Sequence, residues 1–122
     1  MPLAFVIDEN LRGPLWRAIQ RHNAKGDLLL NCERVGNPND LPLGTSDPEL
    51  IRWAQSAGRI IVTSDASTMP GHLADHLAAG SHSPGIFILL PHATFFDVLE
   101  FLTLAAYASE ATEWADRIEY LG

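Results

Sequence analysis

The sequence lacks several features that would define a chemistry at once. Cys32 is its only cysteine, which excludes an internal disulfide and a zinc site built from cysteines. It contains no glycine-rich phosphate loop, no dinucleotide-binding fingerprint and no nucleophile elbow, so the enzyme classes that depend on these motifs are excluded. Because Cys32 closely follows three leucines, we interpret it as a buried structural thiol rather than a nucleophile.

Long hydrophobic runs are also missing. The longest apolar-rich stretch, residues 93–108, is interrupted by Asp97 and Glu100 and falls short of the ~20 residues that a membrane span needs. The N-terminus has neither a basic leader nor a signal-peptide pattern. We therefore expect a cytoplasmic protein that makes no membrane contact.

Positive charge is scarce. The 122 residues include 8 basic and 15 acidic side chains, a net charge of −7, which argues against nucleic-acid binding by charge alone. The charge is uneven, since residues 1–34 hold five basic and four acidic side chains and residues 91–122 hold one basic and six acidic. A polyanion should therefore approach the N-terminal half, unless these charges only solvate helix faces.

The remaining pattern predicts one domain, spanning residues 1–122, in which strands and helices alternate. Apolar, β-branched runs predict strands, and apolar residues at helical spacing between turn residues predict helices. The alternation predicts a three-layer α/β/α sandwich around a mainly parallel sheet of four to five strands. We expect strands at 3–8, 28–35, 59–63, 85–90 and 117–121, and helices at about 11–23, 46–57, 70–79 and 95–109.

The last predicted helix, 95–109, carries more apolar surface than one core requires. Phe95, Leu99 and Leu102 belong to one stripe, and Val98 and Phe101 to another. This width predicts a homodimer through residues 95–109. The alternative is a helix buried on two sides by the sheet and the C-terminal tail.

Carboxylates stand at three corresponding places of the predicted fold. Asp8 and Asp65 each end a short apolar strand, and Asp47 opens the helix that follows a long loop. Carboxyl ends of parallel strands share one sheet edge, so the three acids should converge there. Clustered carboxylates suit Mg²⁺ or Mn²⁺, hard cations that prefer oxygen ligands and can activate water against a phosphodiester.

Each acid also has a purely structural interpretation. Asp8 is able to cap the first helix, and Asp65 a turn. Asp47 is either an N-cap followed by Pro48, or it is free because Ser46 and Glu49 form a capping box. We favour the capping role for Glu49 and leave the two roles of Asp47 open.

A second candidate site is weaker. His72 and His76 are four residues apart, a spacing at which two helical histidines can share a metal ion. No third ligand is evident in the sequence, so an exposed pair on an amphipathic helix is the favoured interpretation.

Several segments, taken in order, carry a resemblance to a known family. The main ones are Asp8-Glu9-Asn10-Leu11, Ser46-Asp47-Pro48-Glu49-Leu50-Ile51 with Trp53-Ala54, and Gly58-Arg59-Ile60-Ile61-Val62-Thr63-Ser64-Asp65. Shorter matches continue through residues 67–69, 79–80, 84–86 and 113–121. In this combination the chain resembles the short PIN-like domain family.

The resemblance implies the PIN fold and a Mg²⁺- or Mn²⁺-dependent endoribonuclease, of the type found as toxins in toxin–antitoxin systems. Asp8, Asp47 and Asp65 match the catalytic, metal-binding acids of that family. The chain lacks a further glutamate of classical PIN nucleases, and Ser67 stands where many have another acid.

Two functions follow as expectations. The first is cleavage of single-stranded RNA at Asp8, Asp47 and Asp65, with an antitoxin protein as partner. The second is a PIN-like protein with little or no catalysis that acts as a binding or regulatory partner through its apolar C-terminal helix. The residues expected to contact substrate or support the acids are Asn10, Arg12, Arg17, Glu49 and Ser67.

Overall fold

A five-stranded, all-parallel sheet forms the centre of the protein. The structure, a computed structural model, describes residues 2–11 and 13–122. The strand order is β2-β1-β3-β4-β5, and each neighbouring pair is parallel. The predicted parallel sheet is thereby confirmed, and it has five strands, the larger of the two numbers expected. The strands are β1 (Ala4–Ile7), β2 (Asn31–Arg34), β3 (Arg59–Thr63), β4 (Ile86–Leu89) and β5 (Ile118–Leu121).

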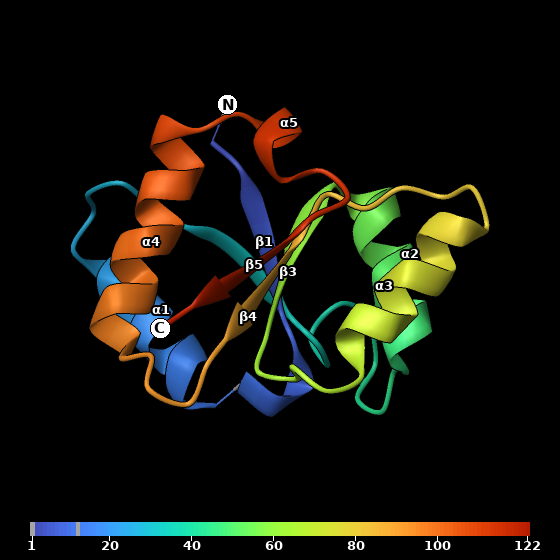
Figure 1. The fold of residues 1–122 in the computed structure, drawn as a ribbon. Helices are drawn as coiled ribbons and strands as arrows, with labels where there is room; N and C mark the ends of the chain where they lie inside the picture. The colour runs from blue at the N-terminus through green and yellow to red at the C-terminus, as the bar shows by residue number, and fades with distance from the viewer. Residues whose placement is uncertain (1, 12) are drawn as a thin grey trace.

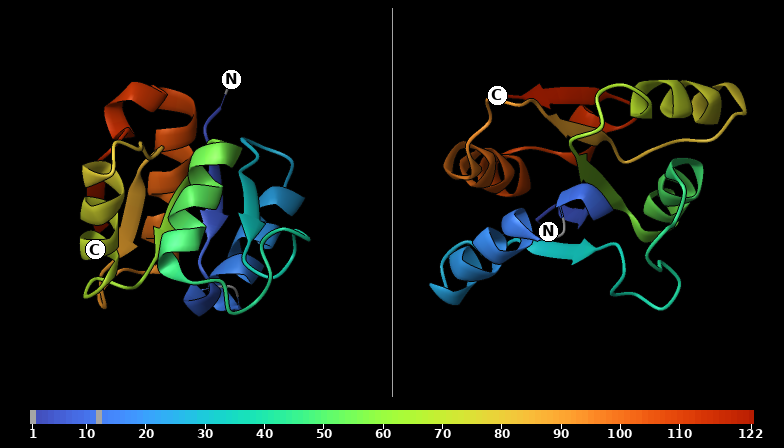
Figure 2. Two further views of the ribbon diagram at one scale, coloured as in Figure 1. Left: turned by 90° about the vertical axis from the view of Figure 1, so that its right-hand side faces the viewer. Right: turned by 90° about the horizontal axis from the view of Figure 1, so that it is seen from below.

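Helices cover both faces of this sheet, as the alternating pattern predicted. In Figure 1, α1 and α4 lie to the left of the strands, and α2 and α3 lie to the right; the views of Figure 2 show the same three layers. The helices are α1 (Pro14–Ala24), α2 (Asp47–Ala57), α3 (Met69–Ala78), α4 (Phe95–Ala108) and the short α5 (Ala111–Trp114), with a 3-10 turn η1 (Glu9–Leu11) after β1.

The three inner strands, β1, β3 and β4, are largely apolar because both of their faces are buried. Phe5 and Ile7 of β1 belong to the core under α1 and α4, whereas Val6 between them belongs to the core under α2 and α3. The other two inner strands alternate in the same way, since successive side chains of a strand point to opposite faces. A continuous apolar run thus produces two cores.

Both ends of α2 are where the sequence predicts them. Ser46 is the N-cap, and it forms a capping box with Glu49. Gly58 ends the helix in the left-handed conformation, with φ of 68°, which glycine adopts without a steric cost.

The first helix begins later than predicted. Residues 9–11 form η1, and α1 starts at Pro14 after Gly13. Proline fits the first position of a helix, because its φ is already helical and the amide hydrogen it lacks would have no helical partner there. The apolar residue Leu11 belongs to the same core but enters it from a separate turn.

The second strand is shorter than the predicted 28–35. The side-chain amide of Asn23 makes two hydrogen bonds with the backbone of Leu30. Its oxygen accepts from the Leu30 nitrogen at 2.8 Å, and its nitrogen donates to the Leu30 carbonyl at 2.9 Å. These bonds occupy the groups that a strand would use for pairing, so β2 begins at Asn31. Leu28 has φ of 34° and is exposed.

The short helix α5 was not predicted, although it completes one core. Trp114 packs edge-on against Phe87 of β4 and Phe101 of α4, with ring centroids 5.1 and 5.8 Å away. The backbone of Trp114 passes so close to Gly85 that a Cβ there would lie 2.6 Å from its carbonyl oxygen. Only glycine therefore fits before β4.

The remaining helix and strand boundaries differ little from those predicted. Helix α3 starts at Met69 and β5 at Ile118, each within a residue of its expected start. None of the helices in the described residues combines the length and apolarity that a bilayer crossing requires.

Candidate functional site

The three predicted acids lie at the carboxyl edge of the sheet, the lower edge in Figure 1. With the order 2-1-3-4-5 the chain reverses its direction of winding between β1 and β3, and open α/β sheets place their ligand sites at such a switch point. Ile7 is in register with Val62, and the backbone nitrogen of Asp8 donates to the Val62 carbonyl at 2.9 Å. Asp8 and Thr63 therefore leave the sheet side by side.

Asp8 is buried at this switch point. Its Oδ2 accepts a hydrogen bond from the Thr63 hydroxyl at 2.8 Å, and its Oδ1 accepts from the backbone nitrogen of Glu9 at 2.7 Å. Burial raises the pKa of Asp8, and the charge of Asp65 adds to that rise. Helix α1 has Gly13 as its N-cap and no side-chain cap, so the interpretation of Asp8 as the cap of that helix is wrong.

Asp65 orders the turn between β3 and α3. Its Oδ1 accepts from the backbone nitrogens of Ser67 at 3.1 Å and Thr68 at 2.9 Å, and both hydroxyls also donate to its carboxylate. These bonds, those from Thr68 above all, lower the pKa of Asp65 to about 2. Asp65 therefore caps this turn, as one of its two interpretations predicted. The lowered pKa keeps its carboxylate in the charged form.

The carboxylate of Asp47 makes fewer hydrogen bonds with the surrounding structure than those of Asp8 and Asp65. Ser46 provides the cap, and its hydroxyl donates to Glu49 Oε1 at 2.7 Å, so of the two interpretations the capping box is confirmed. Asp47 Oδ2 instead accepts from the Thr68 hydroxyl at 3.3 Å. Burial raises the pKa of Asp47, and the charges of Asp8 and Asp65 raise it further.

The three carboxylates therefore form one electrostatic cluster, which we call the acid rim. The Thr68 hydroxyl contacts both Asp47 and Asp65 and joins α2 to the β3–α3 turn. Among the described residues no lysine or arginine forms an ion pair with the rim. The His72 ring lies close to it, with Nε2 3.9 Å from Asp47 Oδ2.

The acid rim has the donor chemistry of a site for a hard divalent cation, which takes carboxylate and hydroxyl oxygens. Its present geometry is not that of a bound ion. As the side chains lie, the described residues include no group of three or more His, Cys, Asp or Glu side chains arranged to hold a metal. To hold a cation, the carboxylates must turn toward a common point, and Asp47 is the least restrained.

The predicted supporting residues have different positions. Asn10 clamps η1 to the end of β3, since its amide contacts the Thr63 hydroxyl at 3.5 Å and accepts from the Ser64 nitrogen at 3.4 Å. Ser67 donates to Asp65, and Glu49 serves the capping box. These three side chains support the local structure.

Of the two predicted arginines, Arg17 belongs to the described residues and lies in α1. Nη1 of Arg17 is 3.9 Å from the position that a Cβ on Gly13 would take. Its guanidinium therefore lies beside the start of α1, the end of the helix nearest the rim. Arg12 lies outside the described residues.

Sequence reasoning missed three residues around the acids. Thr63 and Thr68 donate to the carboxylates, and His72 faces Asp47. The Thr-Ser-Asp ending of the strand is a signal that could have identified Thr63. Nothing local identifies His72, which was paired with His76, whereas the His76 ring lies 2.7 Å from the carbonyl oxygen of His82.

A small cavity adjoins the rim between α2 and α3. Its volume is about 220 Å³, and the side chains that line it include Arg52, His72, Asp75 and His76. Arg52 makes no hydrogen bond or ion pair with any described residue, although its charge contributes to lowering the pKa of Glu49, after the hydrogen bonds of that carboxylate with Ser46. Basic groups thus lie beside the acids on this face of the sheet.

Comparison with known proteins gives no further guide to this site. No family model matches the chain, and neither the curated proteins nor the solved structures include a match.

Proposed function

We propose that the acid rim is the catalytic centre of a Mg²⁺- or Mn²⁺-dependent endoribonuclease in a PIN-like domain, acting on single-stranded RNA. The observation that supports it most is the convergence of Asp8, Asp47 and Asp65, from three different elements, at the β1–β3 switch point. Burial raises the pKa of Asp8 and Asp47, and the charge of Asp65 adds to both rises; a divalent cation would relieve that repulsion.

Under this proposal the chain holds the cation and orients the substrate. The cation, when bound, stabilises charge on the phosphodiester and activates the attacking water. Thr63 fixes the Asp8 carboxylate, and Thr68 fixes Asp65 and contacts Asp47. Arg17, whose guanidinium lies beside the start of α1, contacts a phosphate of the RNA under this proposal.

A role as the toxin of a toxin–antitoxin pair follows from the same proposal. The PIN-like resemblance supports it, and an antitoxin protein would then be a partner. Expression of the wild type should arrest growth of the host cell, and expression of Asp65→Asn should not.

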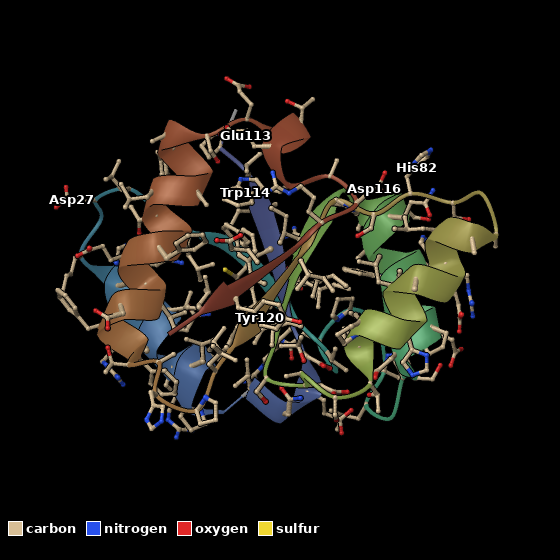
Figure 3. All side chains as sticks on the ribbon, viewed as in Figure 1. Asp27, His82, Glu113, Trp114, Asp116 and Tyr120 are labelled. Atoms are coloured by element: carbon tan, nitrogen blue, oxygen red, sulfur yellow. The ribbon has the colours of Figure 1, made fainter. Side chains whose placement is uncertain are left out.

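The direct test is cleavage of single-stranded RNA by purified protein in Mn²⁺. We expect Asp8→Asn, Asp47→Asn and Asp65→Asn to lose cleavage, because each removes a charged oxygen donor while keeping the shape of the side chain. Asp27→Asn is the matched control, since Asp27 is exposed and lies away from the rim (Figure 3). Cleavage retained in all three rim variants, with melting temperatures showing that they are folded, would refute the proposal.

A second candidate function is a protein without catalysis that binds a partner protein through α4. It is favoured by the engagement of Asp8 and Asp65 in structural hydrogen bonds and by the exposed apolar side chains of α4, such as Phe96. Under this function the rim variants leave all activity in the cell unchanged, whereas Phe96→Ser abolishes it. The two functions are therefore separated by the same set of variants.

A further inference from the structure

The exposed apolar side chains gather on one side of the molecule. Among residues 2–11 and 13–122, eight large hydrophobic residues are exposed, and six of them belong to α4 or to the segment before β2. The Tyr107 hydroxyl donates to the Leu29 carbonyl at 2.5 Å, which joins these two parts of the surface. The six are Leu28, Leu29, Phe95, Phe96, Leu104 and Tyr107. Contiguous apolar surface of this kind marks an interaction site.

A groove runs through this surface between α1 and α4, which lie side by side in Figure 1 and in the right-hand view of Figure 2. Its volume is about 510 Å³. Phe95, Phe96, Leu99 and Leu104 line it from α4. Phe96 is 75% exposed, so it projects from the surface beside the groove.

The charges around the groove have opposite signs on its two walls. Glu100 lies on the α4 wall, and Arg21 and Lys25 lie on the α1 wall. None of the three forms an ion pair with a described residue. A surface that carries both signs in this way is complementary to itself when it is rotated by 180° about an axis through the groove.

We infer that a second copy of this chain occupies the groove, forming a homodimer with twofold symmetry. In such an interface residue i of one protomer meets residue j of the other, and j meets i. The α4 wall of each protomer then faces the α1 wall of its partner, so that Glu100 meets Arg21 and Lys25 twice. Phe96 of each protomer fills the groove of the other.

This dimer is independent of catalysis, because the groove and the acid rim lie on different parts of the molecule. It also covers the α4 surface that the non-catalytic candidate function would use. A partner protein of another sequence could cover the apolar residues without any need for both positive and negative charges around the groove. The groove carries both, and a second copy of the chain matches both.

The first experiment measures the mass of the particle by sedimentation over a range of protein concentrations. We expect the wild type to form a particle of twice 13.4 kDa. Phe96→Ser should raise the dimer Kd by about thirtyfold or more, the effect of losing a central aromatic anchor. Leu43→Ser is the matched control, because Leu43 is also a large, exposed apolar residue but does not line the groove, and it should leave the Kd unchanged.

The second experiment exchanges the charges. Glu100→Lys alone, and Arg21→Glu with Lys25→Glu together, should each be monomers, because like charges then face each other. Mixed in equal amounts, the two variants should form a heterodimer. All of these residues are exposed, so circular dichroism should show folded proteins. A monomeric wild type, a dimer unaffected by Phe96→Ser, or charge variants that do not combine would each overturn the inference.

Discussion

We expect the Asp47→Asn substitution in the acid rim to stabilise the metal-free protein. Asp47 carries a raised pKa because it is partly buried beside Asp8 and Asp65, and its side chain is only 25% exposed. The variant removes one of three mutually repelling charges. Its amide oxygen is still able to accept the hydrogen bond from the Thr68 hydroxyl.

The expected magnitude follows from two opposing effects. Two unit charges about 4 Å apart interact by about 1 kcal/mol in water and about 4 kcal/mol near a protein surface; partial exposure places the relief here near the lower value, about 1–1.5 kcal/mol. Asp47 also opens α2, where a negative charge stabilises the helix by about 0.5 kcal/mol. The net stabilisation should be about 0.5–1 kcal/mol, or roughly 2–4 °C in melting temperature.

The assay is thermal unfolding at pH 8 in EDTA, followed by circular dichroism. At this pH an unperturbed histidine carries no charge, so histidine charge does not offset the repulsion between the carboxylates. Asp27→Asn is the control and should change the melting temperature by less than the rim variant. A fall in melting temperature for Asp47→Asn would show that the rim carboxylates do not repel one another as the structure indicates.

Three further variants test the local structure. Thr63→Val removes the hydroxyl that donates to buried Asp8 and should cost about 1–3 kcal/mol in urea denaturation, since an ionisable group loses a partner; no change would show that this bond is absent. Ser46→Ala removes the N-cap of α2 and should cost about 1 kcal/mol by the same measurement, whereas an unchanged midpoint would refute that assignment. Asp116 lies beside His82 (Figure 3), whose ring nitrogen is 2.8 Å from its carboxylate; that bond, with one from the backbone of Ser83, lowers the pKa of Asp116. The stability that it gives is therefore present above its unfolded pKa of 3.8 and is lost as pH falls through the lower folded value. The wild type should unfold at higher urea than Asp116→Asn at pH 6 and not at pH 2, and an equal gap at both pH values would contradict this.

Much of the fold was predictable because it depends on short-range patterns. Apolar runs that end on Asp8 and Asp65 read as buried strands, and the Ser46–Glu49 pair marked the start of α2. The errors arose where a side chain forms hydrogen bonds with the backbone of another segment of the chain. Asn23 binds the backbone of Leu30 and thereby delays β2, and no pattern within residues 28–35 reveals that bond.

The candidate site was predictable to a similar depth. Parallel strands that end on carboxylates imply that those carboxylates share an edge, so the pairing of Asp8 with Asp65 followed from the fold. Thr68 and His72 reach Asp47 only because α3 lies beside α2. That packing depends on contacts between distant segments, which a single sequence does not display.

The most direct test of the acid rim as a cation site is the effect of Mn²⁺ on thermal unfolding. A ligand that binds only the native state at 100 times its Kd stabilises it by about 2.7 kcal/mol. Mn²⁺ should therefore raise the melting temperature of the wild type and of the Asp27→Asn control, and should leave that of Asp65→Asn unchanged. An equal rise in all three proteins, or none in the wild type, would contradict the account.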